Sequence, residues 1–373
     1  MTFIPLALEE WHARYESTVS HNAADSGVPA VSLGELVAGP DDLRALAGLT
    51  LGYPPANGTP RLRELVADWA GVDPALVLVT VGAAEAVGAI VATLVDPNDE
   101  IVVIEPGYRQ VPGLAANRGA RVRTVRLNPD RAWRLDLDAL EAAVRPGVRL
   151  IAVTNPSNPL GTVFTPAEMA ALVRVAAHHG AWLLADEVYR GSERVGDALT
   201  PSFAGRYDRT VCVGSLSKSF GLPGLRIGWL IAPPDILDQA CRRHEYATIA
   251  ASTLSMYLAE RALEPAIRAA LLRRGRAHVR AGYDRLADWV ARSEGLLSIV
   301  PPAATATGFV RYHADISSVD VAQAVRVGRR ALICPGALFG GEGHVRIGHT
   351  VAPSTLDIVL AAVIRTVQDL AVA

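Results

Sequence analysis

The only lysine of the chain lies in the stretch Ser215-Leu216-Ser217-Lys218-Ser219-Phe220-Gly221-Leu222-Pro223-Gly224-Leu225-Arg226-Ile227-Gly228-Trp229. Lysine and arginine together number 36, so the other 35 are arginine. A general preference for arginine would explain why lysine is rare, but not why Lys218 lies between hydroxyl side chains and an arginine. An amine can lose its proton and form a Schiff base with a carbonyl, which a guanidinium cannot do. The stretch therefore predicts a catalytic lysine.

Short apolar runs alternate with helical patterns on both sides of this stretch. Apolar, β-branched runs predict strands at 77–81, 101–104, 122–125, 150–154, 182–185, 211–214 and 227–231. Helices are expected at 84–94 and, after the capping box Thr165-Pro166-Ala167-Glu168, up to about His179. Such alternation predicts an α/β fold, with a buried, mostly parallel sheet between two layers of helices.

The last third of the chain has a different pattern. Helical sequence runs from about 234 to 293 with a break near Glu264-Pro265, and short strands are expected at 297–300, 308–312 and 345–347. Helices should follow Ser317 and Ser354. We therefore expect a large cofactor-binding domain at 48–240, then a connecting helix and a small α+β domain at 241–373. The segment 1–47 is expected to be irregular and to pack with the small domain.

Composition excludes several classes of protein. The formal net charge of -2 provides no basic excess for nucleic acid. No uncharged apolar stretch is long enough to span a bilayer, and the N-terminus does not resemble a signal peptide. The cysteines Cys212, Cys241 and Cys334 are odd in number and widely spaced, which predicts neither disulfides nor a metal site. We expect a cytoplasmic protein with no membrane or nucleic-acid partner.

Polar and small residues follow several of the predicted strands, where ligands bind in α/β sheets. Gly82-Ala83-Ala84 could let a phosphate approach a helix N-terminus, or could simply form a tight turn. Asp186 ends an apolar strand, where it could face a protonated ring nitrogen, cap a helix or pair with an arginine. Asn158 lies in an Asn-Pro-rich segment that could be only a turn, or could bring its amide to a phenolic oxygen.

Taken together, these residues match the needs of a pyridine cofactor that carries an aldehyde and a phosphate. Lys218 would form the imine, and Asp186 would keep the ring nitrogen protonated. Asn158 and Tyr189 could reach the ring hydroxyl. A phosphate cup would consist of Ser215, Ser217, Arg226 and the turn at Gly82.

Nearly the whole chain resembles the pyridoxal-phosphate enzymes of fold type I, aminotransferase class I/II. The resemblance rests on Leu51 to Pro55 with Gly58, Leu62 and Arg63, on Thr80 to Ala86, on Glu105-Pro106-Gly107-Tyr108, on the segments around Asn155, Asp186 and Lys218, and on His344-Val345-Arg346-Ile347-Gly348. It implies pyridoxal 5'-phosphate as cofactor and Lys218, Asp186 and Tyr108 as catalytic residues, with Tyr108 stacked on the ring.

The resemblance also assigns roles to the remaining positions. Phosphate ligands would be Gly82, Ala83, Ala84, Ser215, Ser217 and Arg226, and Tyr53 would reach the phosphate of the other subunit in a homodimer. Arg346 would grip the substrate α-carboxylate, although an arginine in this place could also form a surface salt bridge. The other residues that we expect to bind the substrate are Asn158, Gly27 and Val28. Leu160 and Ala84 depart from the family pattern without affecting these roles.

The N-terminal segments, among them Asp25-Ser26-Gly27-Val28-Pro29, look like a subgroup that includes capreomycidine synthase and lincosamide-pathway enzymes. The resemblance thus implies an enzyme that forms an external aldimine with an α-amino acid and removes the Cα proton, most often an aminotransferase. The alternative is a lyase, a cyclase, or a decarboxylating or oxidatively deaminating enzyme of a specialised, antibiotic-type pathway. A ligand-sensing regulator would carry a helix-turn-helix domain, for which no segment is left over.

Overall fold

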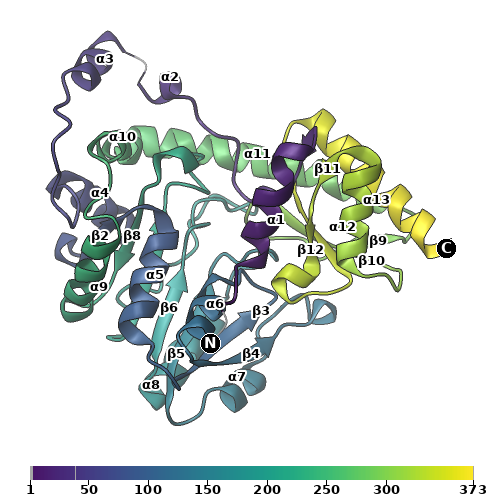
Figure 1. The fold of residues 1–373 in the computed structure, drawn as a ribbon, viewed down its shortest axis with the longest axis horizontal. Coiled ribbons are helices and arrows are strands. Elements are labelled where there is room, and N and C mark those ends of the chain that lie inside the picture. Colours follow the sequence, from purple (N-terminus) through teal and green to yellow (C-terminus); the bar gives the residue numbers. More distant parts are fainter. Residues whose placement is uncertain (1–2, 38, 373) are drawn as a thin grey trace.

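The protein has two lobes, which the long helix α11 (Pro265–Ala291) connects (Figure 1). Our structure is a computed structural model that describes residues 3–37 and 39–372. The larger lobe is built on a seven-stranded sheet, and the smaller lobe on a four-stranded sheet near the C-terminus.

The seven strands lie in the order β2-β8-β7-β6-β5-β3-β4. All neighbours are parallel except β8, which runs antiparallel to both β2 and β7. The mostly parallel sheet expected from the sequence is therefore confirmed, and the ends of β2, β7, β6 and β5 meet at one edge. The strands are β2 (Val77–Thr80), β3 (Glu100–Glu105), β4 (Arg121–Arg126), β5 (Val148–Thr154), β6 (Trp182–Asp186), β7 (Thr210–Ser215) and β8 (Gly228–Ile231).

Helices cover both faces of this sheet because its strands are apolar on both sides. One face packs against α5, α6 and α9, where Ile90 and Leu237 join Leu150 and Leu184 in one buried cluster. The opposite face packs against helices that include α4 and α8. The helices of this lobe are α4 (Pro60–Ala70), α5 (Gly82–Leu94), α6 (Gln110–Asn117), α7 (Leu137–Ala143), α8 (Pro166–His179) and α9 (Pro234–Ala247).

Helix α8 shows how directly local sequence sets a boundary. The Thr165 hydroxyl accepts from the Glu168 N–H at 3.2 Å, and the Glu168 carboxylate accepts from the Thr165 N–H at 2.7 Å. This capping box satisfies N–H groups that the first turn leaves free. The helix ends at Gly180, whose φ of 64° suits a residue without a Cβ. Both predicted ends are confirmed.

The C-terminal lobe contains the sheet β12-β13-β10-β9, flanked by α12 (Ser318–Arg329) and α13 (Pro353–Val372). Its strands are β9 (Leu297–Ile299), β10 (Thr307–Tyr312), β12 (Cys334–Pro335) and β13 (His344–Gly348). The helical region before it breaks at Glu264, as predicted, where α10 (Thr253–Leu263) meets α11. A second break at 248–252 was not foreseen, because the left-handed residue there is Ile249, with φ of 69°, rather than a glycine.

The N-terminal segment is more regular than expected. Helix α1 (Ala7–Tyr15) crosses between the lobes (Figure 1), and β1 (His21–Asn22) pairs in parallel with β11 (Ala331–Leu332). The Trp11 indole donates to the Ile333 carbonyl at 3.0 Å. Helices α2 (Leu33–Leu36) and α3 (Pro40–Ala47) instead lie near α10, where Asp42 pairs with Arg261. Short amphipathic pieces of this kind carry too few turns for a clear periodic signal.

Within residues 3–37 and 39–372, we find no helix with the length and apolar character needed to cross a membrane. The same part of the chain has no group of His, Cys, Asp and Glu side chains arranged to hold a metal ion.

Candidate active site

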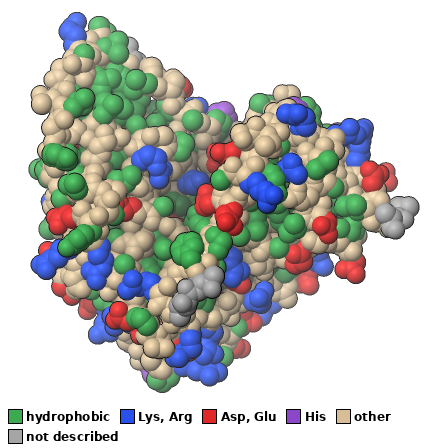
Figure 2. All heavy atoms as spheres, viewed as in Figure 1, with side chains coloured by type: hydrophobic (Ala, Val, Ile, Leu, Met, Phe, Trp, Pro, Cys, Tyr) green, Lys and Arg blue, Asp and Glu red, His purple; other side chains and the backbone are tan. Residues whose placement is uncertain are grey.

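A cavity of about 760 Å³ lies between the lobes, at the edge where the parallel strands end. The molecular surface is hollowed there (Figure 2). Eleven of the residues singled out from the sequence line this cavity: Ala83, Ala84, Tyr108, Asn158, Asp186, Tyr189, Ser215, Ser217, Lys218, Arg226 and Arg346. The fold thus brings together residues that are more than 260 positions apart in the chain.

Lys218 lies in the turn that follows β7. Its Nζ donates to the Ser26 hydroxyl at 2.9 Å. The neighbouring carboxylate of Asp25 accepts from the N–H groups of Ser26 and Gly27. Partial desolvation raises the pKa of Asp25, but the charge of Lys218 and these N–H groups outweigh it and hold the pKa below its usual range. A negative charge is therefore fixed beside the lysine amine.

Asp186 is the last residue of β6 and faces the cavity. Its Oδ1 accepts from the Val188 N–H at 3.2 Å. Burial raises its pKa to about 6, against the opposing effects of that N–H and of the more distant Lys218 charge. Within the described residues, no cation lies within ion-pair distance of this carboxylate. A cationic ring nitrogen in the cavity would supply the missing partner.

An anion-binding cup surrounds the N-terminus of α5. Gly82 has φ of 77°, and a Cβ at this position would overlap the Arg226 guanidinium. Arg226 Nη1 lies 3.5 Å from the Ser217 hydroxyl, and the Ser217 N–H donates to Ser215 Oγ at 3.2 Å. In the part of the chain that the structure describes, Arg226 forms no ion pair. Helix N–H groups, hydroxyls and an unpaired guanidinium are the donors that a phosphate needs.

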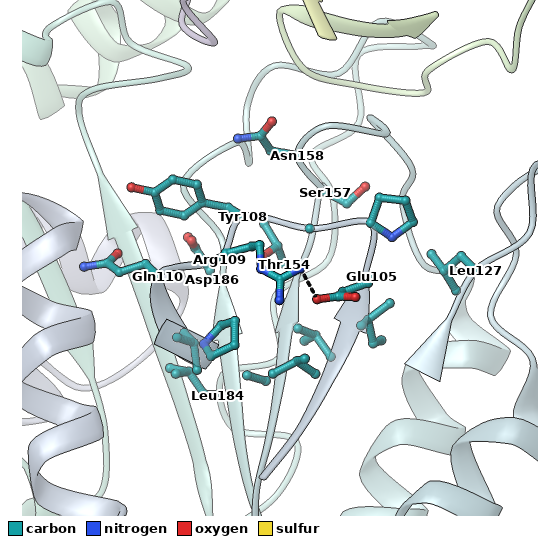
Figure 3. Close-up of a pocket in the computed structure, with 18 of the residues that line it drawn as sticks. Glu105, Tyr108, Arg109, Gln110, Leu127, Thr154, Ser157, Asn158, Leu184 and Asp186 are labelled. Atoms are coloured by element: carbon teal, nitrogen blue, oxygen red, sulfur yellow. Dashed lines mark ion pairs between the residues drawn. The ribbon is translucent and has the colours of Figure 1, made fainter. Parts of the chain in front are cut away.

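Tyr108, Asn158 and Asp186 lie together above the ends of the sheet strands (Figure 3). The Tyr108 hydroxyl donates to Glu9 Oε1 at 2.9 Å. Burial, together with the Glu9 carboxylate, raises the pKa of Tyr108, so its hydroxyl stays protonated. The amide of Asn158 is buried, as is Tyr189. Both side chains line the same cavity wall and could contact a ring held there.

Arg346 comes from β13 in the C-terminal lobe, and its side chain is only 1% exposed. Nη1 donates to Asn158 Oδ1 at 3.1 Å, while Nη2 contacts the Ala24 carbonyl and the Cys334 sulfur. Nε has no hydrogen-bond partner within the described residues. The alternative of a surface salt bridge is therefore wrong, because this guanidinium is buried and no carboxylate pairs with it there.

Four expected site residues do not line the cavity. Tyr53 is 87% exposed and lies outside it, whereas Gly82 lies directly beneath Arg226. Gly27 passes close to Lys218, and its carbonyl accepts from Thr350. The expectation for Val28 needs correction: its side chain packs with Val279 and Ala306 and does not line the cavity, while its N–H donates to the Lys218 carbonyl at 3.3 Å.

The sequence of residues 36–363 matches the family model described as aminotransferase class I and II. The chain belongs to this family. Capreomycidine synthase from Streptomyces vinaceus is 32% identical over 360 residues, which cover 95% of this chain and 92% of that protein. A pyridoxal-phosphate-dependent aminotransferase from Streptococcus suis superposes with a TM-score of 0.92 at 30% identity over 99% of both chains. The pyridoxal-phosphate-dependent cyclase OrfR superposes with a TM-score of 0.89 at 28% identity over 100% of this chain and 99% of its own.

This member of the aminotransferase class I and II family is an enzyme of fold type I that depends on pyridoxal phosphate. Three features described above fit that cofactor. Asp186 is a desolvated carboxylate in need of a cation, Arg226 is a guanidinium without a carboxylate, and Lys218 directs its amine into the same cavity. Because these groups line one cavity, a single molecule can engage them all.

Sequence reasoning did not assign a role to one wall of the cavity of this aminotransferase-family enzyme. That wall comes from the N-terminal segment and consists of Leu6, Leu8, Glu9, His12, Ala13, Glu16, Asn22, Asp25 and Ser26. The wall follows no predicted strand, and the partners Ser26 and Lys218 are 192 positions apart. The available signal is the likeness of the N-terminal segments to the capreomycidine synthase subgroup, which does not by itself indicate a contact with Lys218.

Proposed function

We propose that this enzyme transfers the amino group of an α-amino acid, and that Arg346 binds the α-carboxylate of that substrate. The observation that carries the proposal is the buried Arg346 guanidinium, which shares one cavity with the Lys218 amine and has no carboxylate partner in the described chain. A guanidinium forms two parallel hydrogen bonds with a carboxylate, so it can fix the direction in which the Cα–H bond points.

The chain's own groups would divide the work as follows. Lys218 Nζ would take the proton from the substrate Cα and hold it for the later proton transfer of the reaction. Ser26 Oγ lies within hydrogen-bond distance of that nitrogen. Asp186, at the end of β6, would pair with the positive charge on the ring nitrogen of the cofactor. Bound pyridoxal phosphate supplies the electron sink for the charge left at Cα.

Other residues would hold the cofactor and shield the reaction. The turn at Gly82, Ala83 and Ala84 would bind the phosphate together with Ser215, Ser217 and Arg226. Tyr108 would cover the ring, and Asn158 and Tyr189 would orient it. Asn158 already accepts a hydrogen bond from Arg346, so one amide would connect the ring to the carboxylate site.

We further propose a homodimer in which Tyr53 reaches the partner's phosphate. Five exposed apolar residues support it, namely Leu51, Tyr53, Tyr246, Ile249 and Leu254. They lie on two segments that the Thr253 hydroxyl connects through a 2.7 Å bond to the Gly52 carbonyl. An exposed apolar area of this kind is typical of subunit contacts. We also propose a cytoplasmic enzyme, with residues 48–240 as cofactor domain and 241–373 as connecting helix and small domain.

A second candidate function is a cyclase or lyase of a specialised biosynthetic pathway. It is supported by the likeness to capreomycidine synthase over 95% of the chain and to the cyclase OrfR. Both candidates need the same lysine, the same carboxylate and the same arginine, so the site itself serves either outcome.

A rapid-mixing experiment separates the two candidates. The holoenzyme is mixed with each of the twenty proteinogenic amino acids while absorbance is recorded, and the products are analysed by mass spectrometry. Stoichiometric pyridoxamine phosphate together with a 2-oxo acid supports transamination. Release of ammonia or carbon dioxide with an unchanged cofactor supports the lyase or cyclase. If no amino acid changes the spectrum, both candidates fail.

A further inference from the structure

The Arg346 guanidinium rests against aromatic rings in the C-terminal lobe. Its Cζ lies 4.8 Å from the centroid of the Phe339 ring. Phe339 meets Phe309 edge-on at 6.2 Å, and Phe309 stacks on His344 at 4.6 Å with an angle of 7°. Phe309 is also the residue opposite Arg346 in the β10–β13 register. We call Phe309, Phe339 and His344 the aromatic cluster; it supports the guanidinium from within its own lobe.

Trp133 reaches this cluster from the other lobe. It lies between β4 and α7, yet its ring centroid is 5.5 Å from that of His344 and 6.1 Å from that of Phe309. The side chain is 4% exposed. The Trp133 indole therefore contacts β13 at His344, which lies two positions before Arg346.

The backbone holds Trp133 in an unusual conformation. Ala132 and Trp133 have φ angles of 51° and 58°, a left-handed region that residues with a Cβ adopt rarely. Such a conformation persists where the surroundings fix it. The Trp133 N–H donates to the Asn128 carbonyl at 2.9 Å. This bond closes the turn from which the Trp133 ring extends toward the aromatic cluster.

The residues that follow anchor this turn to the larger lobe. Glu168, at the N-terminus of α8, accepts from Arg134 Nε at 3.1 Å and from the Leu135 N–H at 3.0 Å. The same carboxylate closes the capping box of α8. Trp133 is consequently attached to the larger lobe, while the aromatic cluster belongs to the C-terminal lobe.

His344 meets Trp133 as a neutral ring. Its Nδ1 lies 3.0 Å from the Glu342 carbonyl, which can only accept, so Nδ1 carries the hydrogen. Burial lowers the pKa of His344, which keeps the ring uncharged at neutral pH. The contact between the lobes is therefore apolar, and the guanidinium of Arg346 is the cation that the cluster supports.

We propose that Trp133 is a positioning residue for substrate binding: it holds the aromatic cluster, and through the cluster it sets the place of the Arg346 guanidinium relative to the larger lobe. The inference rests on the proposed role of Arg346 as the carboxylate ligand. Without the indole, Phe309 and His344 lose one of the contacts that tie the C-terminal lobe to the larger lobe, while the Gly107 N–H, which donates to the Phe339 carbonyl at 3.0 Å, and the Arg346–Asn158 bond remain. The two N–H bonds of the guanidinium then no longer meet the carboxylate in the required direction, because that geometry depends on both lobes.

The test measures selectivity for the carboxylate in Trp133→Leu and Trp133→Phe holoenzymes. Both variants keep a Cβ, so the backbone at this position is as strained as before. The probe is the proteinogenic amino acid with the largest absorbance change in the wild type, paired with the amine that lacks its carboxylate. The readouts are the two dissociation constants, their ratio, and the dissociation constant of pyridoxal phosphate itself. Trp182→Phe, a buried tryptophan at the far end of β6 from Asp186, is the matched control.

We expect Trp133→Leu to reduce the selectivity ratio on the order of tenfold, as is common for coupling between packed side chains, and Trp133→Phe to reduce it less. The affinity for pyridoxal phosphate and for the amine should stay within about twofold of wild type, as should all values for Trp182→Phe. In an Arg346→Lys background, Trp133→Phe should have no further effect on the ratio, because both changes act through the same guanidinium.

An unchanged ratio in a folded Trp133 variant would overturn the inference, as would an equal loss of amine and amino-acid binding. If Trp133→Leu does not fold, Trp133→Phe and its combination with Arg346→Lys decide by the same criteria. An Arg346→Lys enzyme with the wild-type ratio would instead refute the proposed function. The two failures are therefore distinguishable.

Discussion

Asp186 allows the electrostatics of the site to be tested in the cofactor-free protein. Its pKa of about 6 lies above the ordinary aspartate value of 3.8, because burial disfavours the charged form. The folded chain therefore binds the proton more tightly than the unfolded chain does. Between about pH 4 and pH 6 the carboxyl is ionised in the unfolded chain but still protonated in the folded chain. The free energy of unfolding therefore falls as the pH rises through this range.

The size of this effect follows from the two pKa values. A difference of about 2 units corresponds to roughly 3 kcal/mol once both states are ionised. About half of it, on the order of 1 kcal/mol, should be lost between pH 5 and pH 8, a range in which the protein is convenient to handle. Asp186→Asn keeps an oxygen that can accept from the Val188 N–H but has no charge to bury. Its unfolding free energy should lack this component.

The assay is urea unfolding of the cofactor-free wild type and of Asp186→Asn at pH 5, 6, 7 and 8. We expect the difference in unfolding free energy between the variant and the wild type to grow by on the order of 1 kcal/mol, in favour of the variant, across that range. Saturating pyridoxal phosphate at pH 8 should then stabilise the wild type more than the variant, because only the wild type gains a charge pair. A pH-independent difference, or a wild type that gains on the variant, would refute the reasoning.

Three further outcomes are expected at other positions. Borohydride reduction of the holoenzyme should attach the cofactor covalently to Lys218, as peptide mapping would show. A label on another residue would contradict the catalytic role of this lysine. The Lys218→Ala variant should bind the cofactor noncovalently but lose turnover. Arg346→Lys should weaken amino-acid binding roughly 10- to 100-fold in spectral titration, the loss expected for one charge-assisted hydrogen bond, while cofactor affinity is unchanged. Tyr53 should act across a dimer interface, so sedimentation should give a dimer, and mixing inactive Lys218→Ala with inactive Tyr53→Ala chains should restore part of the activity in hybrid dimers.

Most of the larger lobe could be predicted from local sequence. Most strands there are short apolar runs, although the edge strand β4 (Arg121–Arg126) contains three arginines, and the α8 boundaries follow from the Thr165 and Glu168 side chains and from Gly180. The cofactor residues follow those strands directly, so the position of Asp186 or Lys218 in the chain already indicates its place at the sheet edge. Local interactions determine these features, and local sequence therefore reveals them.

What could not be predicted depends on contacts between distant segments. The resemblance placed Val28 on the substrate side, but its side chain packs with Val279 and Ala306. The break at Ile249 and the turn at Trp133 both place a residue with a Cβ in the left-handed region. No turn residue marks either position, because tertiary packing rather than local preference stabilises them.

The position of Arg346 shows why the site needs both lobes and the N-terminal segment. The larger lobe contributes Asn158, the N-terminal segment contributes the Ala24 carbonyl, and the small lobe contributes Cys334 and the Phe339 ring. These contacts leave Nε without a hydrogen-bond partner among the residues that the structure describes. A buried donor without a partner is unfavourable, and a substrate carboxylate would satisfy it. Amino-acid binding should therefore draw the three segments together, because each of them holds one side of the same guanidinium.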